Sequence, residues 1–126
     1  MGRMLSLAVL VIPGVTALTT FDTMAADKFQ KLTGSQIRAK FIGMEMTDNV
    51  HWADVFGANG ALKTIAMSRK TDGKWWVDKN DLCVDRGAES GGCYQVWISG
   101  TKVELRREGL DAPILEGVLQ RQAKRQ

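Results

Sequence analysis

Hydrophobic residues are distributed along this chain in two different patterns. Residues 4–12 form one mostly apolar run, whereas from residue 44 onward apolar residues come in short runs separated by turn-forming residues. Turn signals at intervals of about eight to twelve residues are typical of antiparallel sheets. The pattern therefore predicts a mainly β domain, a small antiparallel β-barrel or sandwich, with turns at Asp48-Asn49, Gly57 to Gly60, Thr71 to Gly73, Asn80-Asp81, Gly87 to Gly92, Ser99-Gly100 and Gly109 to Pro113.

The segment before these strands carries the signals of a helix start. Thr33 and Gln36 have the spacing of a capping box, and Gly43 is placed to end the helix. We expect one N-terminal helix over residues 34–42, packed on the sheet through Ile37, Phe41 and Ile42. With this helix the fold is α+β by strict count.

Side-chain alternation predicts which residues of two hairpins face the core. A two-residue turn at Asn80-Asp81 gathers the apolar residues of one hairpin on a single face, and a two-residue turn at Ser99-Gly100 does the same for the next hairpin. The core residues predicted in this way are Trp75, Val77, Leu82, Val84, Tyr94, Val96, Ile98, Val103 and Leu105.

The outer face of these hairpins carries two of the four tryptophans. Trp76 and Trp97 lie there with both cysteines, and the registers place Lys102 beside Trp97 and Glu104 beside Gln95. Neighbouring exposed indoles commonly mark a contact surface for a partner, a sugar or a lipid. The candidate contact surface is therefore Trp76, Trp97, Gln95 and Lys102. In the alternative interpretation, the helix or the apolar segment near the C-terminus packs over this face and buries the indoles.

Farther upstream the alternation is less regular. From Val50 to Phe56 alternate residues are apolar, but Asp54 shares their face, which requires a bulge or a position at the rim. A three-residue turn at Thr71 to Gly73, with its glycine in the left-handed region, would direct Ile65 and Met67 toward the core residues of the next strand.

The N-terminal run has the features of a secretory signal peptide. It follows a positively charged start, and Pro13-Gly14 breaks it well before the roughly 20 apolar residues that a membrane-spanning helix needs. Cleavage fits after Ala17 or after Ala26. We expect the second, which makes residues 1–26 the leader and residues 27–126 one β-rich domain with a short flexible tail. Retention of the leader as a membrane anchor and its burial within the domain are the alternatives.

The two cysteines are expected to form a disulfide. Cys83 and Cys93 flank a small loop, and an exported chain meets an oxidising environment in the periplasm or outside the cell. Closing such a loop is worth about 2–3 kcal/mol in the chain-entropy model. A structural zinc site needs four ligands, which two cysteines and one histidine do not supply. We therefore expect neither a metal nor a cofactor.

Charge excludes one class of partner. The formal net charge is +3, and it is spread along the chain. Nucleic-acid binders concentrate basic residues on one face or stripe, whereas the dense groups here are Arg106-Arg107 and residues 121–125. A solvated strand edge and a tail explain both groups, so no nucleic-acid partner is expected.

The single histidine is the candidate for acid–base chemistry. Asp48 and Asp54 stand three residues to either side of His51. Residues three apart lie on opposite faces of a strand, so a His-Asp pair requires a turn or a bulge there. A partly exposed histidine without a catalytic role is the simpler interpretation. The serines lack the context of a nucleophile elbow, and the glycines of residues 87–92 are not followed by the Lys-Ser/Thr of a phosphate loop.

The order of the short motifs points to a known kind of protein. Leu32-Thr33-Gly34-Ser35-Gln36-Ile37 is followed by an aromatic strand ending in Gly60-Ala61-Leu62, then by Gly73-Lys74-Trp75-Trp76-Val77, Leu82-Cys83-Val84 and Cys93-Tyr94. In this order, over residues 30–106, the chain resembles small secreted alphaproteobacterial domains of unknown function. The resemblance implies periplasmic export and a helix with a β-barrel body, and it implies no activity.

Together these features favour a non-enzymatic binding or interaction module that is periplasmic or secreted. Its partner would be an envelope protein or a small ligand. One alternative is a small cell-envelope hydrolase or lyase that uses His51 with Asp48 or Asp54. The other is a membrane-tethered accessory subunit that keeps the N-terminal apolar segment, the one case in which we expect a membrane contact.

Overall fold

A computed structural model describes residues 2, 9–14, 28–87 and 91–123 of the chain. Residues 9–14 form neither helix nor strand. Most of the predicted leader, both predicted cleavage points, residues 88–90 of the predicted Gly87 to Gly92 turn and the last residues of the predicted tail lie outside the described residues. Among those residues, no helix is long and apolar enough to cross a bilayer.

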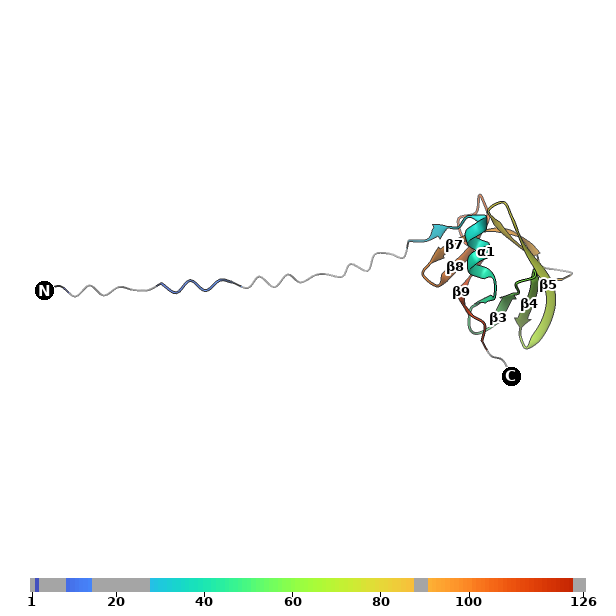
Figure 1. Cartoon of the computed structure of the whole chain (residues 1–126), viewed down its shortest axis with the longest axis horizontal. Coiled ribbons are helices and arrows are strands. Elements are labelled where there is room, and N and C mark those ends of the chain that lie inside the picture. Colours follow the sequence, from blue (N-terminus) through green and yellow to red (C-terminus); the bar gives the residue numbers. More distant parts are fainter. Residues whose placement is uncertain (1, 3–8, 15–27, 88–90, 124–126) are drawn as a thin grey trace.

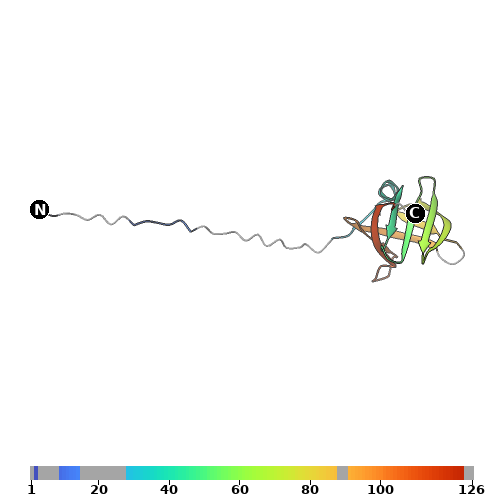
Figure 2. The ribbon, with the colours of Figure 1, turned by 90° about the horizontal axis from the view of Figure 1, so that it is seen from below.

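The described part of the chain forms a closed antiparallel β-barrel with one helix, as the alternation predicts, and it is a barrel rather than a sandwich (Figures 1 and 2). Each barrel strand pairs with the next along the chain, and the last pairs with the first, which closes the ring. The strands of the ring are β2 (Met44–Thr47), β3 (Trp52–Phe56), β4 (Ala61–Ala66), β5 (Arg69–Asp78), β6 (Asp81–Asp85), β7 (Gly91–Ser99), β8 (Lys102–Arg106) and β9 (Leu115–Arg121). A short strand, β1 (Gln30–Lys31), pairs with the end of β7 outside this ring.

This up-and-down order gives the barrel two different ends. The turns β3–β4, β5–β6 and β7–β8 lie at one end, and the turns β2–β3, β4–β5, β6–β7 and β8–β9 lie at the other. Helix α1 (Gly34–Phe41) lies across the first end, because the Gly34 N–H donates to Asn80 Oδ1 (2.9 Å) and the Gly43 N–H donates to the Phe56 carbonyl (2.7 Å). We call this the helix end and the opposite one the loop end.

The helix closes its end of the barrel with apolar side chains. Ile37 and Phe41 are fully buried, and the Phe41 ring makes an edge contact with Phe56, which makes another with Trp75. The predicted capping box is present, with both of its hydrogen bonds made between Thr33 and Gln36. The prediction that Ile42 packs on the sheet is wrong, because Ile42 follows the helix and is 40% exposed.

The two predicted hairpin turns are each displaced by one residue, but the predicted faces are right. Val77 pairs with Leu82 and not with Val84, so the first turn is Lys79-Asn80, with Lys79 in the left-handed region at φ 53°. Ser99 pairs with Lys102, so the second turn is Gly100-Thr101. A change of partner by two residues keeps every side chain on its face.

The turn predicted at Thr71 to Gly73 is wrong. The chain reverses at Met67-Ser68, with φ values of 53° and 67°, and β5 runs straight through the predicted turn. Ile65 therefore faces outward, opposite Lys70, and Met67 lies at the turn. Gly73 serves a close approach between strands, because a Cβ there would lie 2.0 Å from the Asp85 carbonyl oxygen.

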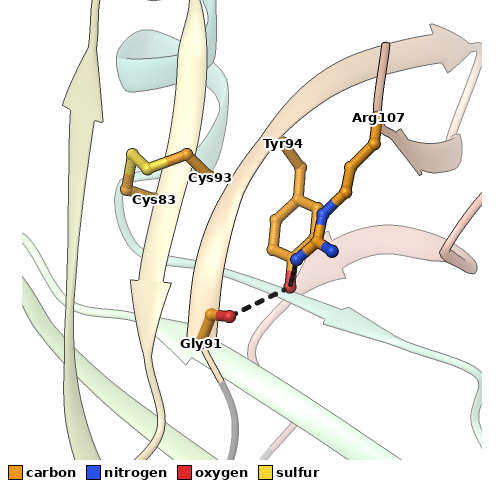
Figure 3. The surroundings of a disulfide bond; sticks show 5 residues. All are labelled: Cys83, Gly91, Cys93, Tyr94 and Arg107. Carbon is orange, nitrogen blue, oxygen red and sulfur yellow. Dashed lines mark hydrogen bonds between the residues drawn. A yellow bond between two sulfur atoms is a disulfide. The ribbon is translucent and has the colours of Figure 1, made fainter. Parts of the chain in front are cut away.

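Cys83 and Cys93 form the predicted disulfide (Figure 3). They are directly opposed on β6 and β7, on the outer face of the barrel, with Cα atoms 4.0 Å apart.

Reduction of this disulfide should lower the free energy of unfolding by about 2–3 kcal/mol, because it restores chain entropy to the unfolded state. Urea unfolding with and without reductant measures this difference. Thiol labelling of the denatured, unreduced protein should detect no free cysteine, and two labelled thiols would contradict the assignment.

Candidate functional site

Adjacent tryptophans on β5 have opposite environments. Trp75 points into the barrel, is 6% exposed, and donates its indole N–H to the Gly57 carbonyl (2.8 Å). Trp76 points outward, opposite Cys83, and is 47% exposed. This difference follows from the alternation of side chains along an extended strand. Trp76 is thus the exposed tryptophan of the candidate contact surface.

Trp76 lies between two hollows of the protein surface. One hollow of about 500 Å³ is lined by residues of the β3–β4 turn and of β5, including Asn59, Gly73 and Lys74. The other, of about 220 Å³, is lined by Arg38 and Ile42 at α1, by Ala58 and by Val77. The Asn59 side-chain oxygen already accepts the Ala61 N–H (3.1 Å), which leaves its NH₂ as a donor. The indole thus stands beside cationic and amide donors.

Trp97 also points outward, but other side chains cover it. The Arg106 guanidinium lies over its ring at 4.3 Å from the centroid, and the Trp97 indole N–H donates to Gln95 Oε1 (3.1 Å). Arg106 also lies over the ring of Phe29, at 5.7 Å, and forms an ion pair with Glu104. Trp97 is half-buried as a result.

The predicted neighbours of Trp97 and Gln95 are corrected by the register. Glu104, and not Lys102, pairs with Trp97, while Arg106 pairs with Gln95. Lys102 pairs with Ser99 and lines a separate hollow of about 450 Å³ over β2, β8 and β9. The cause is the one-residue displacement of the turn between β7 and β8.

The two outer tryptophans are not adjacent. Trp76 pairs with Cys83, Cys83 pairs with Cys93, and Trp97 follows Cys93 by four residues on β7. The disulfide and Gln95 therefore lie between the two indoles. The structure divides the candidate surface into an exposed region at Trp76 and a packed region at Trp97.

The turn between β2 and β3 brings His51 and Asp48 together, as a pair three residues apart requires. The His51 Nδ1 and Asp48 Oδ2 atoms lie 2.7 Å apart, while Asp48 Oδ1 accepts the N–H groups of Val50, His51 and Trp52. Desolvation raises the pKa of the Asp48 carboxyl, but these hydrogen bonds outweigh it and hold the pKa well below its usual range. Asp48 therefore orders the turn backbone, and the His51 side chain remains 69% exposed.

Asp54 belongs to a buried polar cluster that sequence reasoning missed. It shares the inner face of β3 with Trp52 and Phe56, but the predicted bulge or rim position is wrong, because β3 pairs with both neighbours without a bulge and Asp54 is 1% exposed. Val50, which the alternation places on the same face, lies in the turn before β3 and is 78% exposed. Asp54 accepts hydrogen bonds from the Thr64 hydroxyl (2.7 Å) and from Arg86 Nε (3.1 Å), with a second contact from Arg86 Nη2. Burial lowers the pKa of Arg86, but Asp54 and Tyr94 raise it above its ordinary value. Asp54 is thus paired with Arg86 and not with His51.

The signal for Arg86 was present in the chain. Leu82 and Val84 face the core, and continuing the alternation places Arg86 on the same side near the loop end. Beside it, the Arg107 guanidinium stacks over the Tyr94 ring, 5.0 Å from its centroid, and the Tyr94 hydroxyl points toward the Gly91 carbonyl (Figure 3). The barrel interior near the loop end is therefore filled by the pair of Asp54 and Arg86 and by the Tyr94 ring, while Arg107 is exposed.

Within residues 28–87 and 91–123, no group of three or more His, Cys, Asp or Glu side chains is arranged to hold a metal ion. A scan against protein-family models, a search of curated proteins and a search of solved structures each gave no match to this chain.

Proposed function

We propose that this protein is a non-enzymatic binding module of the periplasm or extracellular space, and that its contact surface centres on Trp76. The observation that carries the proposal is an indole 47% exposed between two surface hollows. Leaving so much aromatic surface in water forgoes the stabilisation that burial gives, and tryptophan is enriched where proteins bind partners. The predicted leader and the disulfide support the proposed compartment.

The groups around Trp76 indicate the chemistry of the ligand. The indole offers a flat apolar face, while Arg38, Lys74 and the Asn59 amide offer positive charge and hydrogen-bond donors. A partner that fits would place an aromatic, aliphatic or sugar-ring face on Trp76 and acceptor or anionic groups in the hollows beside it. An envelope protein or a small ligand can supply both.

Retention of envelope components by immobilised protein tests this proposal. Wild-type protein should retain a component from a detergent-free soluble envelope extract, and Trp76→Ala should reduce its retention by about tenfold or more, as expected for an aromatic residue at the centre of an interface. Val50→Ala, which shortens an exposed side chain at the loop end, is the matched control and should retain the component normally. Equal retention by wild type and Trp76→Ala would remove the proposed surface.

A further inference from the structure

Exposed apolar side chains gather at the loop end of the barrel. Between residues 28 and 123, excluding the undescribed residues 88–90, six large apolar side chains are at least 40% exposed, and two of these, Ile42 and Trp76, lie by the helix end. The other four lie in turns or loops at the loop end: Val50 (78% exposed), Met67 (83%), Leu110 (54%) and Ile114 (43%). This surface is separate from the one proposed at Trp76.

These side chains occupy three neighbouring connections. Val50 lies in the β2–β3 turn, Met67 in the β4–β5 turn, and Leu110 and Ile114 in the β8–β9 connection. Because β9 pairs with β2 and β3 pairs with β4, the three connections follow one another around the barrel rim. Residues of the first two turns, among them Val50 and Met67, line a common hollow of about 350 Å³. The four exposed apolar side chains thus form an arc along the rim of the loop end.

The turn at Met67 departs from the usual chemistry of its conformation. Both Met67 and Ser68 are in the left-handed region, as in a type I′ turn, where Asn-Gly is strongly preferred. A methionine here is conformationally unfavourable, and its 83% exposure means that it gains little from packing within the domain. Residues that break a local rule without a structural gain are expected at functional positions.

Basic residues stand next to this turn. Arg69 and Lys70 follow Ser68 directly and are exposed, and Arg107 opens the β8–β9 connection. Glu108 and Asp111 also lie in that connection and Asp48 lies in the β2–β3 turn, so positive charge predominates only at the β4–β5 turn. A Lys or Arg near an anionic membrane surface is attracted to the lipid phosphates.

We propose that the loop end binds the surface of a bilayer that contains anionic lipids. The side chains of Val50, Met67 and Leu110 enter the interfacial layer, while Arg69 and Lys70 contact lipid phosphates. A protein interface commonly covers about 800 Å² per partner with close shape complementarity. Single apolar tips on separate connections suit a fluid interface better, because lipids rearrange around each of them. This contact does not depend on retention of the leader.

Vesicle co-sedimentation tests the proposal with the protein as purified from the cell envelope. Wild-type protein should bind vesicles of phosphatidylethanolamine with phosphatidylglycerol more strongly than neutral phosphatidylcholine vesicles. The double variant Val50→Ser with Met67→Asn should bind the anionic vesicles about tenfold or more weakly, because it removes two inserted apolar groups. All variants share one N-terminus, so a contribution from a retained leader cancels in the comparison.

The controls separate membrane binding from folding and from the Trp76 surface. Asn is favoured in the left-handed region, so Met67→Asn alone should keep or raise the melting temperature while it weakens vesicle binding. Trp76→Ala, at the other end, should bind vesicles as wild type does. Absence of wild-type binding, unchanged binding of the double variant, or equal binding to neutral and anionic vesicles would each overturn the proposal.

Discussion

Replacing Asp54 with alanine should lower the free energy of unfolding by about 3–5 kcal/mol, because it leaves the Arg86 guanidinium largely buried without its counter-charge. The Arg86 side chain is 15% exposed, and its hydrogen bonds to Asp54 use both carboxylate oxygens. Thr64 loses its acceptor in the same variant. Urea unfolding followed by tryptophan fluorescence measures the change.

Two further variants identify the cause of that loss. Adding Arg86→Met to Asp54→Ala removes the unpaired charge, so the double variant should be more stable than Asp54→Ala alone. Glu104→Ala breaks the less buried pair with Arg106, in which the arginine side chain is 31% exposed, and should cost about 1 kcal/mol or less. A loss of only about 1 kcal/mol for Asp54→Ala would show that water reaches the pair and that its burial is not energetically important.

Local patterns predicted the barrel strands and their faces better than the turns. The inward residues of β5 to β8 are predicted correctly although both hairpin turns are displaced by one residue. Such a displacement changes each pairing partner by two residues, which leaves every side chain on the same face of the sheet. The sequence does not predict the Met67-Ser68 turn, because neither residue is a usual turn signal, and it predicts a turn at Gly73, where the glycine instead permits a close contact with β6. A glycine signal alone does not distinguish these two uses.

The alternation of side chains predicts the candidate site only in part. Alternation correctly sends Trp76 and Trp97 to the outer face, but it carries no information about what covers them. The Arg106 side chain of β8 covers the Trp97 ring, and its position depends on the pairing of β7 with β8. The pair of Asp54 and Arg86 likewise joins residues 32 positions apart across the barrel interior.

The adjacent tryptophans of β5 should respond very differently to truncation. Trp75→Ala should lower the free energy of unfolding by about 3–5 kcal/mol, because it empties a position packed against Phe56 at the helix end and leaves the Gly57 carbonyl without its indole donor. Trp76→Ala should cost about 1 kcal/mol or less, since its side chain is already half in water. Urea unfolding of both variants gives the two free energies. Iodide should quench the fluorescence of wild-type protein more than that of Trp76→Ala, because the variant lacks the exposed indole. Equal destabilisation by the two substitutions would mean that both indoles are buried, and the binding surface proposed at Trp76 would then lose its physical basis.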